Sequence, residues 1–243
     1  MTTVLKLGGS VITEKDDPET VDEARLAVAA DAVAAGADDL VIVHGGGSFG
    51  HHHAAEYGVT TTAGTHDAAG VRAIHGAMKR LNDAVVGALA DRGVPAVPIH
   101  PFSAASRDAE GTLTLPTAQV GTLLAEGFVP VLHGDLVAHA GAGATVVSGD
   151  ELVGELAGAV DASRVGVCST VPGVLDADGA VIDTITSFET VADALGGSDA
   201  TDVSGGMAGK VRALLALDSP AHIFGPDALG AFLAGADPGT TVR

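Results

Sequence analysis

The chain has 243 residues, of which 47% are hydrophobic and only 3% aromatic, so its core must be built from Ala, Val, Leu and Ile. With 34 glycines and 10 prolines, the composition is typical of a compact α/β protein with tight turns and excludes a collagen-like or disordered chain. The 31 acidic and 12 basic residues give a net charge of -19, which repels nucleic acid and anionic lipid.

Short apolar runs alternate with segments of helical periodicity. In chain order we expect a strand at 3–7, a helix from Asp17-Pro18 to 36, a strand at 40–43, a helix at 67–92, a strand at 94–99, a helix at 117–126 and a strand at 128–132. There follow a hairpin of 136–140 with 144–147, a helix at 151–160, a strand at 164–168, helices at 188–195 and 205–217, a strand at 221–224, a helix at 227–233 and a strand at 240–242. This alternation predicts an α/β fold, a three-layer αβα sandwich with a mostly parallel central sheet. We expect one domain over residues 1–243, with two lobes that divide near residue 145.

The sequence also predicts where the protein works. No apolar run reaches the roughly 18 residues that a membrane helix needs, and Met1–Gly9 lacks the pattern of a secretory signal. The one cysteine, Cys168, excludes an internal disulfide and fits a reducing cytoplasm. Acidic residues spread along the whole chain are typical of a halophilic cytoplasm, where molar salt shortens the Debye length to about 3 Å and leaves a local anion site undisturbed. We expect a cytoplasmic protein that binds neither nucleic acid nor membrane.

Lysine is scarce, with only four in the chain: Lys6, Lys15, Lys79 and Lys210. Three of them lie in or beside glycine-rich segments, and we expect Lys6, Lys15 and Lys210 to act in chemistry. Lys79 stands beside Arg80 in a helical stretch and is expected to face solvent.

Two glycine-rich segments follow predicted strands. Lys6-Leu7-Gly8-Gly9-Ser10 sits at the carboxyl end of the first strand, where open α/β sheets bind ligands, and its bare amides and lysine suit a phosphate. Gly45-Gly46-Gly47-Ser48-Phe49-Gly50 follows the second strand and matches Gly-x-Gly-x-x-Gly, with Asp67 near the position of a ribose-binding acid. The second segment therefore leaves two interpretations open, a dinucleotide site and an anion-binding nest.

Histidines follow directly, at His51-His52-His53. Neighbouring residues on a helix point about 100° apart, so the three cannot all face one metal, and no further Cys or His stands at zinc spacing. His51, next to the glycine turn, can donate a hydrogen bond to a phosphate oxygen. For His52 and His53 we expect surface or packing roles.

Two charged segments lie further along. Ser148-Gly149-Asp150-Glu151 fits a capping box at a helix start, and Asp150 is expected to pair with Lys6 or Lys210. Asp202–Lys210 places glycines at the start of a helix, a site for phosphate, with Lys210 one turn in. Walker A, protein-kinase and nucleophile-elbow motifs are absent from the sequence. The motifs offer lysines and glycine N–H groups but no nucleophile paired with a base. This combination favours phosphoryl transfer, in which the protein mainly positions anions and offsets their charge.

Five motifs in the chain, spread over residues 6–210, resemble in kind and order those of the amino-acid-kinase superfamily. They are Lys-Leu-Gly-Gly-Ser, His-Gly-Gly-Gly-Ser-Phe-Gly-His, Ser-Gly-Asp, Val-Pro-Gly-Val and Gly-Gly-Met-x-x-Lys. Within it, Gly50-His51 and the Lys6 to Lys15 spacing resemble the isopentenyl phosphate kinases. The resemblance implies the amino-acid-kinase fold, an acceptor-binding lobe at about 1–145, a nucleotide-binding lobe at about 146–243, and isopentenyl phosphate as substrate. It further implies ATP and Mg²⁺ as cofactors, with the metal held mainly by the nucleotide and water and with no metal-ligating residue assigned. A homodimer is the expectation from base rates.

The resemblance also assigns site residues. Lys6, Lys15 and His51 would be catalytic. ATP would contact Lys6, Gly8, Gly9, Ser10, Gly46, Asp150, Thr170, Gly206 and Lys210, and the acceptor phosphate would contact Gly45, Gly50, His51 and Gly149. Where relatives commonly carry Thr-Asp, this chain has Ser169-Thr170, so the expected Asp contact to the nucleotide is lost.

Other functions fit the same motifs. A kinase of this superfamily acting on a phosphonate, a carboxylate, a carbamate or a nucleoside monophosphate is one alternative, although His51 favours phosphate or phosphonate. A non-catalytic nucleotide-binding protein is another, although it has less need of three lysines. A dehydrogenase would leave Lys6, Gly206 and Lys210 unexplained.

Overall fold

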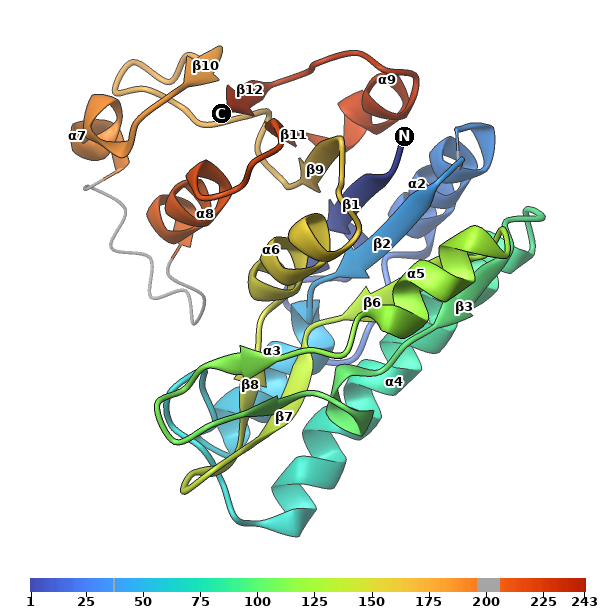
Figure 1. Cartoon of the computed structure of the whole chain (residues 1–243), viewed down its shortest axis with the longest axis vertical. Coiled ribbons are helices and arrows are strands. Elements are labelled where there is room, and N and C mark those ends of the chain that lie inside the picture. The colour runs from blue at the N-terminus through green and yellow to red at the C-terminus, as the bar shows by residue number, and fades with distance from the viewer. Residues whose placement is uncertain (37, 196–205) are drawn as a thin grey trace.

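The computed structural model describes residues 1–36, 38–195 and 206–243, and within them the core is an eight-stranded sheet (Figure 1). The strands in spatial order are β10 (Thr184–Ile185), β12 (Thr240–Val242), β11 (Ala221–Phe224), β9 (Arg164–Cys168), β1 (Thr3–Leu7), β2 (Leu40–His44), β6 (Val129–His133) and β3 (Ala96–Pro98). All described neighbours are parallel except β11 with β12. The expected mostly parallel sheet is confirmed, and β3, which follows Pro95 and ends at Pro98, lies at an edge.

Alternation along the central strands builds two separate cores. Successive side chains of a strand point to opposite faces, and in β1 and β2 both faces are apolar. Val4 joins one cluster and Leu5 the other, while Val41 and Ile42 divide in the same way. A sheet whose strands are apolar on both faces must be covered on both, which explains the three layers.

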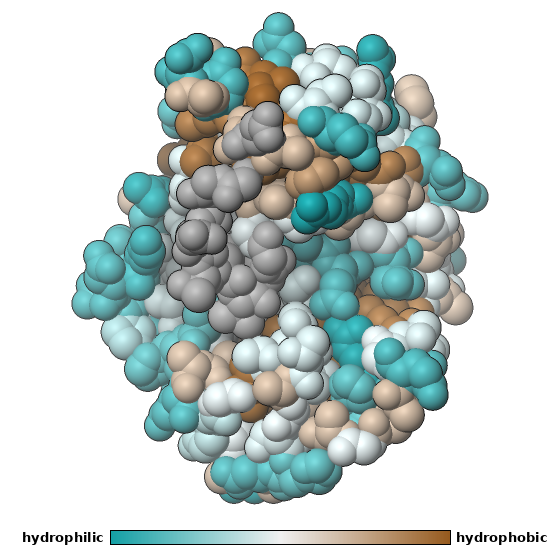
Figure 2. Space-filling view, turned by 90° about the vertical axis from the view of Figure 1, so that its left-hand side faces the viewer, coloured by the Kyte–Doolittle hydropathy of each residue, from teal (hydrophilic) through white to brown (hydrophobic). Residues whose placement is uncertain are grey.

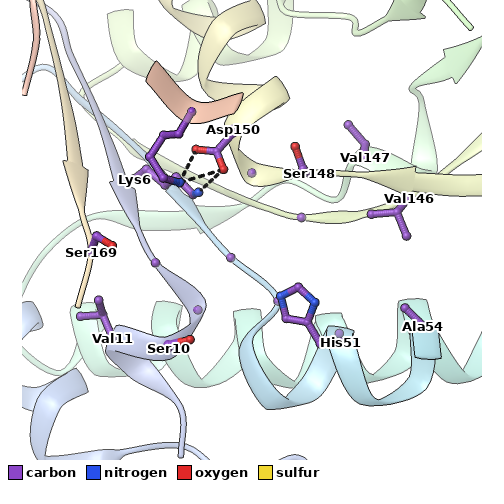
Figure 3. Close-up of a pocket in the computed structure, with 18 of the residues that line it drawn as sticks. Lys6, Ser10, Val11, His51, Ala54, Val146, Val147, Ser148, Asp150 and Ser169 are labelled. Carbon is purple, nitrogen blue, oxygen red and sulfur yellow. Dashed lines mark hydrogen bonds and ion pairs between the residues drawn. The ribbon is translucent and has the colours of Figure 1, made fainter. Parts of the chain in front are cut away.

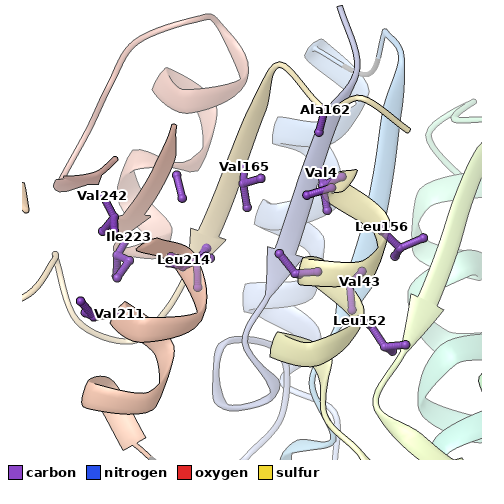
Figure 4. Packing of buried hydrophobic residues seen from close by; sticks show 14 of the residues in the cluster. Val4, Val43, Leu152, Leu156, Ala162, Val165, Val211, Leu214, Ile223 and Val242 are labelled. Carbon is purple, nitrogen blue, oxygen red and sulfur yellow. The ribbon is translucent and has the colours of Figure 1, made fainter. Parts of the chain in front are cut away.

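Helices cover both faces of the sheet. On one face lie α5 (Ala118–Ala125), α6 (Gly149–Ala159) and α8 (Gly206–Leu215), and Figure 4 shows Leu156 of α6 beside Val4 of β1 and Leu152 beside Val43 of β2. On the other lie α2 (Glu23–Ala35), α4 (Ala68–Ala90) and α9 (Leu229–Leu233). The expected three-layer αβα sandwich is confirmed.

A second, four-stranded sheet extends one end of the molecule. Its order is β5 (Leu113–Thr114), β4 (Ser106–Arg107), β7 (Asp135–His139) and β8 (Gly143–Val147). The hairpin expected from Leu136 to Val147 is its β7–β8 pair, and β4 and β5 were not expected. The remaining short elements are α1 (Gly9–Ile12), α3 (Gly47–Glu56), the 3₁₀ turns Pro101–Ser103, Phe188–Thr190 and Pro226–Ala228, and α7 (Ala192–Leu195).

The prediction that a helix begins at Asp17-Pro18 was wrong, because the helix begins later. Asp22 is the N-cap of α2 and accepts a hydrogen bond from the backbone N–H of Arg25 at 2.9 Å. Glu19 has φ 51°, a left-handed conformation that no right-handed helix contains. The segment before Val21 is therefore a loop, closed by a bridge between Thr13 and Val21.

One more helix was predicted too long. The expected helix at 188–195 is a 3₁₀ turn followed by α7, because Val191, with φ -123° between them, leaves the helical region. Of the helix expected at 205–217, α8 covers 206–215, and Gly205 lies outside the described residues. Within the described ranges, none of the helices has both the length and the apolar character needed to cross a membrane.

Candidate active site

Four parallel strands end at one cavity. The chain leaves β1 at Gly8, β2 at Gly45, β6 at Gly134 and β9 at Ser169, and all four residues line a space of about 300 Å³. The carboxyl ends of neighbouring parallel strands meet at the same edge of a sheet, which is where open α/β folds bind ligands. Helices α6 and α8 also begin at this cavity, and the partial positive charge of their N-termini favours an anion there.

Two lysines share one carboxylate inside the cavity (Figure 3). Lys6 Nζ lies 2.7 Å from Asp150 Oδ2, and Lys210 Nζ lies 3.1 Å from the same oxygen and 3.2 Å from Oδ1. The side chains of Lys6, Asp150 and Lys210 are only 9%, 16% and 15% exposed. Pairing of Asp150 with the lysines is confirmed, and it involves both of them. One carboxylate against two ammonium groups leaves an excess positive charge facing the cavity, although the whole chain is acidic.

Burial sets the protonation of this cluster. Desolvation lowers the pKa of the Lys6 ammonium from 10.5 to about 8, opposed by Asp150 and reinforced by Lys210. Burial alone would raise the pKa of the Asp150 carboxyl, but the two ammonium groups outweigh it and hold that pKa below its usual value. Asp150 therefore stays ionised and keeps both lysines aimed at the cavity.

Asp150 is held in place by its helix. Ser148 Oγ accepts from the Glu151 N–H at 3.1 Å, and the Ser148 N–H donates to the Glu151 carboxylate at 3.0 Å, so the expected capping box is confirmed. Arg107 of β4 adds a bond from Nη2 to Glu151 Oε1 at 2.7 Å. The start of α6, which carries Gly149 and Asp150, is thereby fixed relative to the second sheet.

Close backbone packing explains why glycines follow β1 and β2. A Cβ on Gly9 would lie 2.1 Å from the amide nitrogen of Gly47, and one on Gly45 would lie 2.6 Å from that of Gly9. Real Cβ atoms do not approach backbone so closely, so side chains at Gly9 or Gly45 would push the two turns apart. The two turns therefore form one continuous surface of main-chain atoms under the cavity.

Gly134, after β6, is a site residue that sequence reasoning missed. A Cβ placed there would lie 3.5 Å from the amide nitrogen of Gly149 and 3.9 Å from that of Gly46. The amide nitrogens of Gly46 and Gly149 thus lie around this position, together with the Val147 carbonyl oxygen at 3.5 Å, and converging amides of this kind can bind a phosphate group. The signal was present in the sequence, because His133-Gly134 repeats His44-Gly45 at the end of the adjacent strand.

His51 projects from α3 at the rim of the cavity (Figure 3). Its neighbours do not line the cavity: His53 Nε2 lies 2.6 Å from Glu19 Oε1 and its Nδ1 lies 3.2 Å from Glu56 Oε2, while Arg80 also binds Glu19. The ligand atoms of His52, His53 and Glu56 lie within 4.8 Å of one another, but both ring nitrogens of His53 are already engaged. This group supports a packing role at the surface.

The cavity gathers almost every site residue expected from the sequence. Those in its lining are Lys6, Gly8, Gly9, Ser10, Gly45, Gly46, Gly50, His51, Gly149, Asp150, Thr170, Gly206 and Lys210. Lys15 is the exception: it is exposed in the loop between α1 and α2 and is not part of the lining. Asp67 also lies outside the lining and caps α4 by accepting from the Ala69 N–H at 2.8 Å, which leaves the dinucleotide interpretation without its ribose-binding acid.

Other lining residues were not predicted from the sequence as site residues. They are Val11, Ala54, Thr61, Gly134, Asp135, Val146, Val147, Ser148, Ser169, Val171 and Met207. Several come from the second sheet and the loops beside it, which the topology, and no motif, brings to the cavity. Ile74 and Met78 of α4 line it as well, and Phe49 is buried in the core.

The carboxylates of the cavity lining are already paired. Asp150 binds the two lysines, and Asp135 accepts from His75 Nδ1 at 2.9 Å and from the Leu136 N–H at 2.8 Å. Neither is free to ligate a cation in this arrangement. A divalent metal in this cavity would therefore take its ligands from a bound nucleotide and water.

Comparisons with a family model, with known sequences and with solved structures all indicate the same family for this chain. A family model for the amino acid kinase family matches residues 1–222. The isopentenyl phosphate kinase of Haloferax volcanii is 68% identical over 242 residues, 99% of this chain and 98% of the relative. That of Methanothermobacter thermautotrophicus is 36% identical over 229 residues, 88% and 86% of the two chains.

Solved structures agree with the fold. A crystal structure of an isopentenyl phosphate kinase covers 100% of both chains with a TM-score of 0.85 at 28% identity. A product complex of the T. acidophilum isopentenyl phosphate kinase has a TM-score of 0.81 over 100% of both chains at 20% identity, a likeness that concerns the fold alone. With its family model and its relatives in accord, this chain belongs to the amino acid kinase family and, within it, to the isopentenyl phosphate kinases.

Proposed function

We propose that this protein transfers the γ-phosphoryl group of ATP to isopentenyl phosphate, giving isopentenyl diphosphate and ADP for isoprenoid biosynthesis. The observation that carries the proposal is the pair of lysines on Asp150, set where three glycine turns and two helix N-termini meet. An oxygen of the acceptor phosphate bonds to the γ-phosphorus, while the bond from that phosphorus to the β–γ bridging oxygen breaks and ADP leaves. Both reactants are anions, so the protein must hold them in line and offset their charge.

Lys6 and Lys210 are proposed to offset the charge of the transferring group. Their ammonium groups lie on the α6 side of the sheet, next to the turn at Gly8–Ser10 that would hold the ATP phosphates. Thr170 and the start of α8 at Gly206 would complete the nucleotide site, whereas the amide of Gly46, expected from the sequence to contact ATP, is proposed to face the acceptor phosphate. Lys15 is proposed as a third cation, which its exposed loop would carry toward the γ-phosphate.

The acceptor is proposed to bind on the other side of Lys6. Its phosphate would lie beside Gly45, Gly50 and Gly149 and accept from the amides of Gly46 and Gly149, and the His51 imidazole at the rim would donate a further hydrogen bond. Ile74, Met78 and Ala54 would contact the isoprenoid tail, because they form an apolar wall next to the same glycines. Mg²⁺ would offset negative charge on the ATP phosphates, held by those phosphates and water.

A transfer assay tests the function directly. Radiolabelled ATP is offered with a panel of small phosphomonoesters, phosphonates, carboxylates and nucleoside monophosphates in high KCl. We expect isopentenyl phosphate to show the highest kcat/KM of the panel. Preferred transfer to a phosphonate, a carboxylate or UMP would replace the proposed acceptor, and stabilisation by NAD but not ATP in a thermal-shift assay would replace the reaction class.

The lowered pKa of Lys6 predicts a pH limit on ATP capture. The free enzyme needs the Lys6 ammonium, and with a pKa of about 8 only about a tenth of it remains protonated one pH unit higher. The kcat/KM for ATP, which reports on the free enzyme, should therefore fall about sixteenfold from pH 8 to pH 9.5, while kcat holds to higher pH because bound phosphates favour the charged lysine.

Unfolding does not explain such a fall. The folded pKa of Lys6 lies below its unfolded value, so the folded state holds fewer protons between pH 8 and 10.5, and this group adds stability as pH rises through that window. Circular dichroism across the same range is the control. A kcat/KM for ATP that stays level to pH 9.5 would contradict the assignment of Lys6.

Substitution of Gly134 by alanine should block the acceptor without harming the fold. A Cβ there meets no atom closer than 3.5 Å, but it stands among the amides of Gly46 and Gly149. We expect the acceptor KM to rise at least about tenfold, as for loss of one phosphate contact, with ATP binding and the melting temperature nearly unchanged. Gly154→Ala on α6, where a Cβ meets open space, is the matched control and should keep full activity. Normal acceptor kinetics in Gly134→Ala would exclude the volume above Gly134 as the phosphate site.

The proposal also covers the cellular location, the working salt concentration and the assembly of the protein. We propose a cytoplasmic enzyme of the mevalonate route that works at high salt, since its charge is -19 and hydrophilic side chains are spread over the face shown in Figure 2. We also propose a homodimer, the commonest assembly among soluble enzymes. Sedimentation in molar KCl tests the assembly.

A further inference from the structure

Two buried histidines end neighbouring strands at the same level beneath the cavity. His44 is the last residue of β2 and His133 the last of β6, and they are direct partners in the parallel register. Both are 0% exposed, and their rings stack with centroids 5.5 Å apart. Each is followed by a glycine that lines the cavity, Gly45 or Gly134. Neither histidine belongs to the phosphate-binding set proposed above.

Hydrogen bonds fix which nitrogen of each ring carries the proton. His44 Nδ1 lies 3.1 Å from the Gly45 carbonyl oxygen, and His133 Nδ1 lies 2.9 Å from that of Gly134. A carbonyl oxygen only accepts, so Nδ1 must be the donor in both rings. Burial lowers the pKa of His44 to about 4 and that of His133 to about 3, so both are neutral at pH 7 and Nε2 must be an acceptor.

Each Nε2 has a donor that fits this assignment. Asn82 Nδ2 of α4 lies 3.1 Å from His44 Nε2, and His100 Nδ1 lies 2.8 Å from His133 Nε2. Asn82 turns its amide toward His44 and the Val131 carbonyl, and this leaves its Oδ1 buried without a hydrogen-bond partner in the described part of the chain. An unsatisfied buried oxygen costs free energy, so the orientation that creates it must be enforced by its neighbours.

The two imidazoles control where peptide groups point. In a trans peptide the carbonyl oxygen and the next N–H lie on opposite sides. A Gly45 carbonyl held toward the buried His44 ring therefore turns the Gly46 N–H away from it, toward the volume above Gly134, where a Cβ would lie 3.9 Å from that nitrogen. The Gly134 N–H in turn donates to the His44 carbonyl at 2.9 Å, which ties the two turns together.

We propose that His44 and His133 are positioning residues, neutral imidazoles in the Nδ1–H form that orient the glycine turns around the acceptor phosphate, with Asn82 and His100 fixing their tautomers. The proposal rests on the proposed function for the identity of that phosphate. His44 acts through the Gly45–Gly46 peptide without touching substrate. Its loss should therefore weaken the acceptor site more than the nucleotide site, which lies toward Lys210.

His44→Leu and His44→Asn separate this role from simple packing. Leucine fills the core without a donor, whereas the asparagine amide can place an N–H near the position of Nδ1. We expect His44→Leu to raise the acceptor KM at least about tenfold with the ATP Kd within about twofold, and His44→Asn to recover most of that loss. His222→Leu, which replaces a buried histidine of β11 outside the cavity lining, should leave both constants unchanged.

A measurement on the unmodified protein keeps the proposal testable if a variant fails to fold. Long-range ¹H–¹⁵N NMR of the imidazoles at pH 7 should show His44 and His133 as Nδ1–H tautomers, and Nε2–H forms would overturn the proposal. Equal acceptor kinetics in His44→Leu and the unmodified enzyme, or equal losses in His44→Leu and His44→Asn, would overturn it as well. Failure of the proposed function looks different, because the unmodified enzyme would then not phosphorylate isopentenyl phosphate at all.

Discussion

Replacement of Lys6 by methionine is expected to lower kcat about a thousandfold while the protein stays folded. Lys6 is a buried cation in contact with the cavity, and loss of one preorganised group that offsets charge in a transition state costs about 10²–10³ in kcat. Methionine fills much of the space of the lysine side chain, and Asp150 keeps Lys210 as a partner, so no unpaired charge is left in the interior. Steady-state kinetics with isopentenyl phosphate as acceptor measure the loss.

The matched control for Lys6→Met is Lys79→Met. Lys79 is an exposed lysine of α4 with no place in the cavity lining, so its loss removes the same charge without the local effect. Thermal unfolding at pH 7 should show Lys6→Met at least as stable as the unmodified protein, because the cost of burying its ammonium is removed. A kcat within tenfold of normal in Lys6→Met would show that Lys6 is structural.

Replacement of His51 by alanine is expected to lower turnover about a hundredfold and to leave ATP binding within about twofold of normal. His51 stands on α3 beside the glycines proposed for the acceptor, while the Lys210 end of the cavity lies on α6 and α8. A hydrogen-bond donor that acts on the acceptor phosphate during transfer contributes to kcat and not to nucleotide affinity. Single-turnover kinetics with titration of a non-hydrolysable ATP analogue separate the two.

His52→Ala controls for His51→Ala, since His52 is the next residue on the same helix, is exposed and lies outside the cavity lining. His51→Gln, which keeps an N–H donor on a side chain of similar length, should recover part of the turnover. If His51→Ala turned over normally, or lost ATP affinity to the same extent as turnover, His51 would have to be removed from the acceptor site.

The glycine motifs after β1 and β2 indicated where the cavity lies, because each follows a buried strand. Once the alternation of strands and helices indicates a parallel sheet, the ends of its neighbouring strands must share one edge, so Gly8, Gly45 and Ser169 fall together without further information. The pairing of Asp150 with the lysines could also be predicted from the sequence. A capping box fixes the start of its helix and leaves the Asp150 side chain free to contact the lysines.

What the sequence did not reveal depended on contacts between distant segments. The left-handed backbone at Glu19 makes α2 begin later than predicted. Nothing in the local sequence indicates this conformation, because Asp17-Pro18 has the residues of a helix start. Gly134 enters the site only because β6 pairs with β2. Lys15 was grouped with Lys6 and Lys210 because it lies near a glycine-rich segment, but that position does not say which way a loop points, and its side chain is exposed.

A crystal structure with isopentenyl phosphate and a non-hydrolysable ATP analogue tests most directly whether the two lysines on Asp150 stand between the two phosphates. We expect the γ-phosphate within hydrogen-bond distance of Lys6 and Lys210, and the acceptor phosphate on the amides of Gly46 and Gly149 above Gly134. A nucleotide bound away from Lys6, or an acceptor phosphate on the far side of His51, would contradict the account.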